Sequence, residues 1–250
     1  MKLDKYDLYM KAVQDPAGQC DFLRNVYRQS VRRYPKTLRE DFCGCFALAH
    51  EWVSRAGGHR AIAIDKDAPP LSYGKRRFLA SLPISLRPNL QIFRKDVLNF
   101  VGTKADIVCA LNFSYGVLRT RRELKRYLTN CFRNLNSNGL AVVDCLGGFE
   151  NQGVTETRVE YPGFTYFWEQ VSFNPLSREA QFHIHFQPSG GKKTKKVFTY
   201  HWRMWTVPEL RELMDEVGFR STRVYWQGSA RVPEKFEPGE SWVAYLAGQK

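Results

Sequence analysis

The sequence predicts an α/β fold built around a mainly parallel sheet, with antiparallel strands inserted after the fifth strand. From residue 38 to residue 146, short apolar runs alternate with longer amphipathic segments, which is typical of repeated β–α units. After Gly148 the sequence changes to aromatic, alternating runs broken by turn residues, which is typical of antiparallel strands. A chain of 250 residues, 43% of them hydrophobic, suits one large domain over residues 1–250.

The segment before the first strand is predicted to be helical. The stretch DLYMKAVQDPAGQCDFLRNVYRQSVRRYP has helical character and is divided at Asp15-Pro16. We therefore expect two helices that form an N-terminal helical cap over residues 1–36.

Five strands and three helices are predicted between residues 37 and 146. The strands are TLREDF, HRAIAID, LQIFRK, ADIVCAL and LAVVDCL. The helices are FALAHEWVSRAG, then APPLSYGKRRFLASL with prolines in its first turn, then TRRELKRYLTNCFRNL closing at Asn138-Gly139. The connection between the third and fourth strands is too short for a full helix.

The insertion is predicted to span residues 149–205. Its strands are FTYFWEQVSF, REAQFHIHFQ and KVFTYHWRMW, separated by NPLS and by PSGGKKTKK, which have turn or loop compositions. A helix then begins at Thr206, with Glu209 placed for a capping box, and ends at Gly218. FRSTRVYWQG and SWVAYLAG are predicted to be two further strands.

The formal net charge of +13 favours a polyanionic partner or an acidic substrate without choosing between them. The segments RTRRELKR, KRR and KKTKK are either parts of a nucleic-acid-binding surface or solvated faces of separate elements. No stretch approaches the roughly 20 apolar residues of a membrane span, and the N-terminus lacks the apolar core of a signal peptide. We expect a cytoplasmic protein without membrane contact, and its six cysteines, which form no CxxC pair, to be reduced.

The stretch LREDFCGCFALAHEW predicts a strand, a tight turn at Cys43-Gly44 and a helix. Such a turn places helix N-terminal amides at the carboxyl edge of a parallel sheet, where open α/β folds bind ligands. Of the glycines in a GxGxxG dinucleotide loop only Gly44 is present, which argues against a pyrophosphate lying on the backbone. A nucleoside without phosphates tolerates the larger side chains.

Polar residues follow three further strands of this sheet. Asp65 ends the second strand, where a carboxylate accepts hydrogen bonds from the hydroxyls of a ribose. Asp96 follows the third strand and either accepts from an adenine amino group or caps a turn. The fourth strand ends at Asn112, and Phe113, Ser114 and Tyr115 then lie at the same sheet edge.

Together these features resemble the class I S-adenosylmethionine-dependent methyltransferases, over most of the chain. LREDFCG stands in place of the usual acidic-x-Gly-x-Gly loop, Glu40 at the first-strand acid, Asp65 at the second-strand acid, Asp96-Val97 at the adenine side, and NFSY after strand four. The LREDFCG variant, the aromatic insertion, WRMWT and VYWQG look like a subgroup allied to small-molecule N-methyltransferases of the glycine/sarcosine type. The resemblance implies a Rossmann-like seven-stranded sheet, with its last strand antiparallel and helices on both faces.

The resemblance also implies S-adenosylmethionine as cofactor and S-adenosylhomocysteine as product. The cofactor-binding residues that we expect are Glu40, Phe42, Cys43, Gly44, Asp65, Lys66, Asp96, Val97, Asn112 and Phe113. The reaction is an in-line displacement at an activated methyl group, for which the protein aligns and desolvates a nucleophile.

The insertion is expected to cover the acceptor. Candidate substrate-binding residues are Tyr166, Trp168, Arg203 and Trp205, with Arg203 pairing with a substrate anion; the candidate catalytic residues are Tyr115, Glu169 and Arg203. Any of these aromatic residues is equally explained by core packing. We expect a small-molecule amine or hydroxyl acceptor; the alternatives are an RNA, DNA or protein methyltransferase and a catalytically inactive cofactor-binding protein.

The pair His183 and His185 shares one face of a predicted strand. Two histidines on a strand face can be two metal ligands, but no third ligand of suitable spacing follows them in the sequence. We interpret the pair as part of a polar face and predict no metal site.

Overall fold

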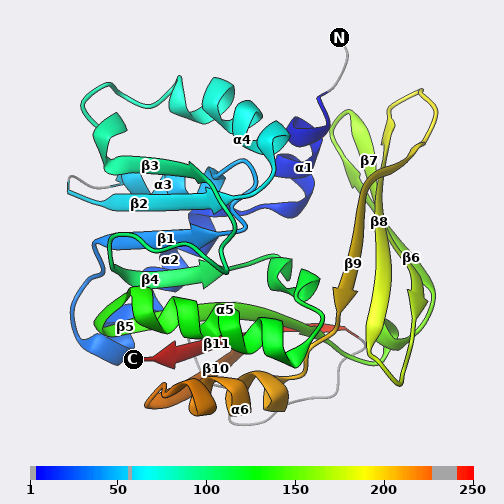
Figure 1. Cartoon of the computed structure of the whole chain (residues 1–250). Helices are drawn as coiled ribbons and strands as arrows, with labels where there is room; N and C mark the ends of the chain where they lie inside the picture. Colours follow the sequence, from blue (N-terminus) through cyan, green and yellow to red (C-terminus); the bar gives the residue numbers. More distant parts are fainter. Residues whose placement is uncertain (1–3, 56–57, 227–240) are drawn as a thin grey trace.

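A computed structural model of the chain describes residues 4–55, 58–226 and 241–250. Its central feature is a seven-stranded sheet in the order β10-β11-β5-β4-β1-β2-β3 (Figure 1). β11 runs antiparallel to both neighbours, β5 and β10, whereas β5, β4, β1, β2 and β3 pair in parallel. The strands are β1 Thr37–Asp41, β2 Arg60–Asp65, β3 Leu90–Arg94, β4 Ala105–Ala110, β5 Leu135–Gly147, β10 Ser221–Trp226 and β11 Trp242–Gln249. The predicted sheet, including its antiparallel last strand, is confirmed.

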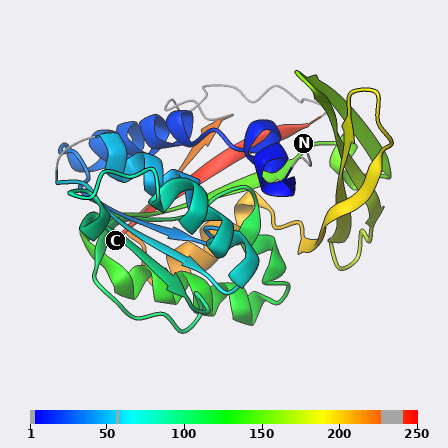
Figure 2. The same cartoon turned by 90° about the horizontal axis from the view of Figure 1, so that it is seen from above.

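Helices cover both faces of this sheet, as expected (Figure 2). One apolar cluster joins α2 and α3 to one face, and a second cluster joins α5 and α6 to the other. The helices are α1 Lys5–Val13, α2 Pro16–Val31, α3 Ala47–Arg55, α4 Ala68–Gly74, α5 Arg121–Asn134 and α6 Val207–Val217. Within the described parts of the chain, no helix is both long and apolar enough to span a bilayer.

Two predicted helix ends differ from the structure. α5 ends at Asn134, before the expected Asn138-Gly139, because Leu135 already pairs with Ala105 and is fully buried as the first residue of β5. α4 ends at Gly74 and is followed by a π-helix, Lys75–Leu79, where one continuous helix was expected. The capping box predicted at the start of α6 is confirmed: the Thr206 hydroxyl and the Glu209 carboxylate each accept the other residue's backbone N–H.

The insertion after β5 is a second, four-stranded antiparallel sheet in the order β6-β7-β8-β9. Its strands are β6 Thr155–Tyr161, β7 Phe164–Phe173, β8 Glu179–Pro188 and β9 Thr194–Arg203. The last three were predicted. β6 was missed because most of its side chains are exposed, so its sequence, TETRVEY, lacks an apolar alternation.

Helix α1 lies between the main sheet and the insertion (Figures 1 and 2). The rings of Tyr6 and Tyr9 lie 5.9 and 5.1 Å from the ring of Phe198 on β9. The Tyr161 hydroxyl, at the end of β6, donates to the carbonyl of Ala12 at 3.1 Å. These contacts tie the N-terminal segment to the insertion and place α1 beside the carboxyl ends of the parallel strands.

A buried ion pair lies within β1. Arg39 Nε donates to Asp41 Oδ1 at 2.7 Å, and both side chains are fully buried. Arg39 also donates to Asn130 Oδ1 on α5 at 3.0 Å. Because side chains alternate along a strand, Arg39 and Asp41 face α5 while Glu40, between them, faces α3. The acids of the LREDFCG stretch therefore have different surroundings.

Candidate functional site

The loop after β1 makes a tight turn with little glycine. Phe42, Gly44 and Phe46 have φ of 54°, 52° and 51°, so two phenylalanines take the left-handed conformation usually left to glycine. Phe46 is fully buried, and its ring and the carbonyl of Cys45 approach Gly74 so closely that a Cβ there would lie 2.4 Å and 2.3 Å from them. Gly74 on α4 thus leaves the space that the Phe46 ring and the Cys45 carbonyl occupy.

Glu40 is a buried carboxylate at the base of this loop. Its Oε2 accepts the backbone N–H of Ala49, in the first turn of α3, at 2.9 Å. Removal from water raises the pKa of Glu40 to about 8, and that one backbone bond only partly opposes the shift. Glu40 has no cationic partner within the described residues. A positively charged ligand group would supply the missing partner.

Asp65 connects the β1 loop to the end of β2. Its Oδ2 accepts the N–H of Gly44 at 2.7 Å, and its Oδ1 accepts the N–H of Asp67 at 2.8 Å. Desolvation raises the pKa of Asp65 despite these bonds. Since each carboxylate oxygen has a further lone pair, Asp65 can accept from a ligand as well.

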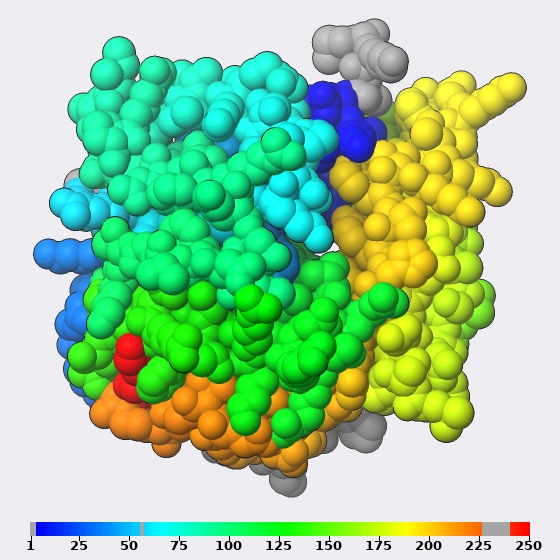
Figure 3. Space-filling view, in the orientation of Figure 1, coloured from blue at the N-terminus to red at the C-terminus, as the bar shows by residue number. Residues whose placement is uncertain are grey.

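A cavity of about 680 Å³ opens over these residues. In the space-filling view a hollow separates the cyan region of α4 from the gold strand β9, and residues of both elements line this cavity (Figure 3). We call it the cofactor cavity. Seven of the expected cofactor residues line it, namely Glu40, Phe42, Cys43, Gly44, Asp65, Lys66 and Asn112.

The other expected cofactor residues lie elsewhere. Asp96 Oδ1 accepts the N–H of Leu98 at 2.8 Å, which is the turn cap that the sequence left as an alternative, and Val97 is buried in the core. Neither lines the cofactor cavity, and Phe113 lines a neighbouring one. Sequence reasoning missed Tyr6 and Tyr9 of α1; their spacing of three residues, which puts both on one helix face, was the available signal.

The neighbouring cavity, of about 620 Å³, lies between the insertion and the ends of β4, β5 and β11; we call it the acceptor cavity. Of the residues that the structure describes, eight aromatic ones line it: Tyr9, Phe113, Tyr166, Trp168, Tyr200, Trp202, Trp242 and Tyr245. The two cavities share Tyr9, Asn112, Tyr200 and Trp202 in their walls. A ligand in one cavity therefore lies next to a ligand in the other.

The architecture matches solved methyltransferase structures at low sequence identity. A S-adenosylmethionine-dependent methyltransferase from Clostridium acetobutylicum aligns with a TM-score of 0.70 and 16% identity, over 96% of this chain and 95% of that one. The amino pentose methyltransferase CalS10 from Micromonospora echinaspora, solved with S-adenosylmethionine bound, gives 0.69 and 14%, over 99% and 98%. The sugar N-methyltransferase KedS8 from Streptoalloteichus gives 0.66 and 17%, over 96% and 92%.

The chain has the Rossmann-like methyltransferase fold. No protein-family model matches the sequence, and no curated protein matches it. In this methyltransferase fold, the two cavities lie at the carboxyl ends of the parallel strands, where open α/β sheets bind their ligands.

Two of the four expected substrate residues, Tyr166 and Trp168, line the acceptor cavity. Arg203 and Trp205 do not line either large cavity. Arg203 pairs with Glu209 at 2.7 Å and lies over the ring of Trp205, while the Trp205 indole donates to the carbonyl of Leu118 at 3.0 Å. Strand alternation explains why Arg203 does not reach the acceptor cavity, since Tyr200 and Trp202 occupy the side of β9 that faces this cavity and Arg203 lies on the other side.

The other expected catalytic residues, Tyr115 and Glu169, also lie outside both cavities. Tyr115 is buried, and its hydroxyl donates to the main-chain carbonyl of Asp144 at 2.7 Å. Within the described part of the chain, the carboxylate that does line the acceptor cavity is Asp144, on β5. Sequence reasoning missed it, although it lies near the carboxyl end of an apolar strand in LAVVDCL, as Asp65 does in its own strand.

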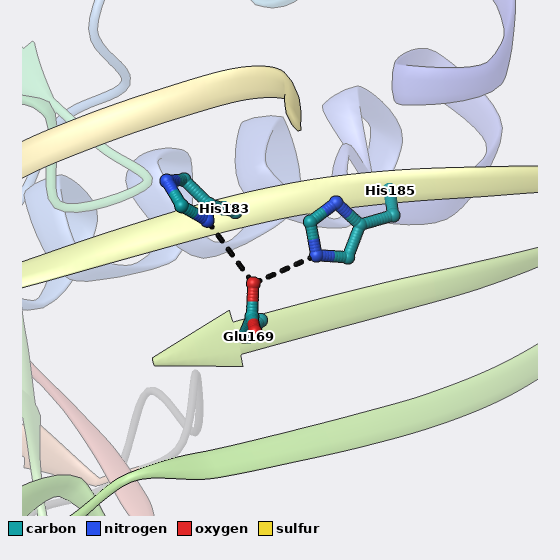
Figure 4. Close-up of side chains that lie close together, drawn as sticks. All are labelled: Glu169, His183 and His185. Atoms are coloured by element: carbon teal, nitrogen blue, oxygen red, sulfur yellow. Dashed lines mark hydrogen bonds and ion pairs between the residues drawn. The ribbon is translucent and has the colours of Figure 1, made fainter. Parts of the chain in front are cut away.

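Glu169 forms a cluster with His183 and His185 on the opposite side of the insertion sheet (Figure 4). Its Oε2 lies 3.0 Å from His183 Nδ1 and 2.9 Å from His185 Nε2. The Lys196 backbone N–H donates to His185 Nδ1 at 2.8 Å, so neutral His185 carries its proton on Nε2 and donates it to Glu169. A metal at Nε2 would need that proton on Nδ1, facing another N–H. The cluster is therefore best explained as a hydrogen-bonded group.

The basic segments lie on three separate elements. Lys75–Arg77 begin the π-helix after α4, and Lys192–Lys196 lie at the β8–β9 connection and the start of β9. In α5, Arg121 and Lys125 both pair with Glu216 of α6. Part of the positive charge is thus used in ion pairs between helices.

Proposed function

We propose that this chain is a S-adenosylmethionine-dependent methyltransferase that methylates a small molecule at an amine or hydroxyl group. The observation that carries the proposal is the pair of adjoining cavities, one lined by Glu40, Gly44 and Asp65 and the other by aromatic residues of the insertion. The methyltransferase fold and the S-adenosylmethionine bound to CalS10 support the same activity.

The residues of the cofactor cavity suit this cofactor. The buried, unpaired carboxylate of Glu40 would hold the ammonium of its methionine part, and Asp65 would accept from its ribose hydroxyls. A Cβ built on Gly44 meets no atom within 4 Å, so this turn leaves space beside the cavity. Because the cofactor has no phosphate, the loop does not need the further glycines of a pyrophosphate site.

When bound, S-adenosylmethionine supplies a methyl group already activated by its sulfonium. The chain's own residues have the remaining tasks. The aromatic walls of the acceptor cavity exclude water, and the four residues common to both walls hold the acceptor close to the cofactor. An amine acceptor then needs a group that takes its proton, whereas a hydroxyl acceptor needs a stronger base.

The first experiment is a calorimetric titration of the protein with S-adenosylmethionine and with S-adenosylhomocysteine. We expect both to bind, with methyl transfer then detected on a panel of small amines and alcohols with labelled cofactor. Failure of both ligands to bind at millimolar concentration would contradict the methyltransferase proposal. Binding without transfer to any acceptor class, including RNA and protein, would favour the inactive cofactor-binding alternative.

The same titration tests Glu40. With its pKa raised to about 8, Glu40 is mostly protonated in the free protein at pH 7, and a cationic ligand group beside it favours the carboxylate. We therefore expect binding to release close to one proton at pH 7, seen as an enthalpy that depends on the ionisation enthalpy of the buffer. Glu40→Gln should abolish this release and weaken binding by roughly 10- to 100-fold.

Glu51→Gln is the matched control, because Glu51 lies on α3 outside the cavity and pairs with Arg55. Glu51→Gln should leave the proton release unchanged.

The raised pKa of Glu40 also has a consequence for the stability of the fold. In the free protein the contribution of Glu40 is fully present below pH 4.5 and is lost as the pH rises through about 8. A bound ligand should reduce that loss.

Three finer predictions remain proposals. The alliance with glycine/sarcosine-type N-methyltransferases rests on the LREDFCG stretch, and the amino sugar and sugar acceptors named for CalS10 and KedS8 are a competing class. Cytoplasmic location rests on the sequence. A nucleic-acid acceptor would be favoured by a salt-sensitive shift in RNA mobility.

A further inference from the structure

The described wall of the acceptor cavity differs in charge from the chain as a whole. The protein carries a formal net charge of +13. Among the described residues, however, the wall of this cavity contains one carboxylate, Asp144, and no lysine, arginine or histidine. Among the described wall residues, a negatively charged acceptor would meet no positive side chain, whereas a cation would meet both a carboxylate and aromatic rings.

Asp144 is a buried carboxylate whose two described hydrogen-bond donors are neutral backbone N–H groups. Its Oδ2 accepts the N–H of Asn112 at 2.6 Å, and its Oδ1 accepts the N–H of Phe113 at 2.9 Å. The ionisable groups that interact with it include Tyr9, Cys109, Tyr115, Cys145 and Tyr245, and none of these carries a positive charge. Burial raises the pKa of Asp144 to about 7. Near neutral pH, this carboxylate is therefore able both to attract a cation and to accept a proton.

The two backbone bonds place Asp144 beside the cofactor cavity. Asn112 and Phe113 both have left-handed backbones, with φ of 56° and 57°, and Asp144 holds this pair in place. Strain of this kind is found at functional sites when the surrounding structure supports it. Asn112 lines both cavities, so Asp144, which bonds to its backbone, is held close to the boundary between them. A methyl group would pass from the cofactor to the acceptor at this boundary.

The opposite wall is a continuous group of aromatic rings. Tyr200 and Trp202 are stacked at 4.6 Å, and Trp168 lies 6.2 Å from Tyr200 and 5.9 Å from Trp202 between ring centroids. The negative faces of such rings attract ammonium groups within about 6 Å, more strongly where water is excluded. Methylated ammonium groups also gain from contact with the apolar rings.

We propose that the acceptor cavity binds a cationic alkylamine, with its ammonium between Asp144 and the Trp168–Tyr200–Trp202 wall, and that Asp144 is the proton acceptor. This inference rests on the proposed methyltransferase function and narrows its substrate to an amine. A cationic acceptor has no need of the substrate-anion pairing that the sequence predicted for Arg203.

The proposed chemistry balances as follows. The ammonium R–NH₃⁺ gives one proton to the Asp144 carboxylate, which leaves a neutral amine and a carboxylic acid. The nitrogen lone pair then forms the N–CH₃ bond while the S–CH₃ bond breaks and its electron pair stays on sulfur. The positive charge passes from sulfur to nitrogen, so the product is a methylated ammonium. Asp144 later returns its proton to water.

Three probes of nearly the same shape test the charge preference directly. Choline, 3,3-dimethylbutan-1-ol and 3,3-dimethylbutanoate differ in carrying a positive, a zero and a negative charge. Binding is followed by tryptophan fluorescence, since Trp168 and Trp202 line the cavity. We expect choline to bind roughly tenfold or more tightly than the alcohol and the carboxylate to bind most weakly. Equal affinities, or a preference for the carboxylate, would overturn the proposal.

Asp144→Asn should reduce the preference for choline over the alcohol to within about threefold. Asp215→Asn is the matched control, because Asp215 is exposed on α6 and the net charge changes equally; it should keep the full preference. Trp168→Leu is a second variant, which leaves the hydrogen bonds between Asp144 and the backbone intact. It should weaken the binding of choline more than the binding of the alcohol. A full preference in both cavity variants would refute the assignment.

Titration with S-adenosylhomocysteine on the same preparations separates this inference from the proposed function. If S-adenosylhomocysteine binds but choline shows no advantage, the amine assignment fails and the methyltransferase proposal stands. If S-adenosylhomocysteine does not bind to the unmodified protein, the methyltransferase proposal itself fails.

With a primary amine as acceptor, kcat/KM should rise with pH through a break near 7, where Asp144 ionises, and Asp144→Asn should remove that break.

Discussion

Replacing Arg39 with methionine is expected to lower the free energy of unfolding by about 3–5 kcal/mol. The change removes the cationic partner of Asp41, whose side chain is fully buried, and leaves that carboxylate uncompensated away from water. It also leaves Asn130 Oδ1 without its bond from Arg39. Urea denaturation followed by circular dichroism measures the loss, which is a large fraction of the total stability of an ordinary domain.

Two comparisons make this expectation specific. Arg158→Met breaks an ion pair with Glu160 in which both side chains are mostly exposed, and it should cost about 1 kcal/mol or less. The double change Arg39→Met with Asp41→Leu removes both buried charges and should recover much of the lost stability. A loss for Arg39→Met no larger than that for Arg158→Met would show that the buried pair contributes little.

Asp65→Ala is expected to weaken the binding of S-adenosylhomocysteine by about 100-fold. Two ribose hydroxyls bonded to a carboxylate contribute about 3 kcal/mol together, which corresponds to this factor. The change also removes the acceptor of the Gly44 and Asp67 N–H groups, so both loops lose a fixed point at the cavity. Calorimetry at constant pH gives the affinity, and the thermal midpoint of the unliganded variant confirms that it is folded.

Asp96→Ala is the informative comparison for Asp65. Both aspartates follow neighbouring parallel strands and both were predicted to bind the cofactor, but Asp96 caps a turn outside the cavity. We expect Asp96→Ala to change the affinity by less than about threefold, as for other surface substitutions. Similar losses of S-adenosylhomocysteine affinity in the two variants would contradict the assignment of Asp65, and not Asp96, to the cofactor cavity.

The order of strands and helices in the main sheet was readable from the sequence because each buried strand is a short apolar run. Seven of the residues that we expected to bind the cofactor line one cavity for a related reason, since the carboxyl ends of parallel strands meet at one edge and the sequence marks those ends with acids and turns. The same rule applies to Asp144, which lies near the carboxyl end of β5 as Asp65 does in β2. Asp144 was missed because Cys145 and Leu146 follow it, so the apolar run LAVVDCL does not end visibly at this acid.

The insertion was harder to interpret because its alternation leaves two choices of face. In β9 the rings of Tyr200 and Trp202 turn inward, so Arg203, one residue further on, turns outward to Glu209. Phe198, Tyr200 and Trp202 share one face of β9, and His201 and Arg203 share the other. Because an aromatic face and a basic face can each line a binding site, the alternation alone does not identify the face that meets the cavity. Tertiary packing makes that choice, and here α1, with its tyrosines against Phe198, contributes to it.

The two phenylalanines in the β1 loop have a consequence for how a ligand would enter. A glycine-rich loop samples many backbone conformations and must be ordered when a ligand binds, which costs conformational entropy. Here Phe46 is fully buried and Phe42 lies 5.6 Å from the ring of Tyr127, so packing holds both residues at positive φ. The loop is therefore preorganised, so a ligand that binds there does not have to order it first.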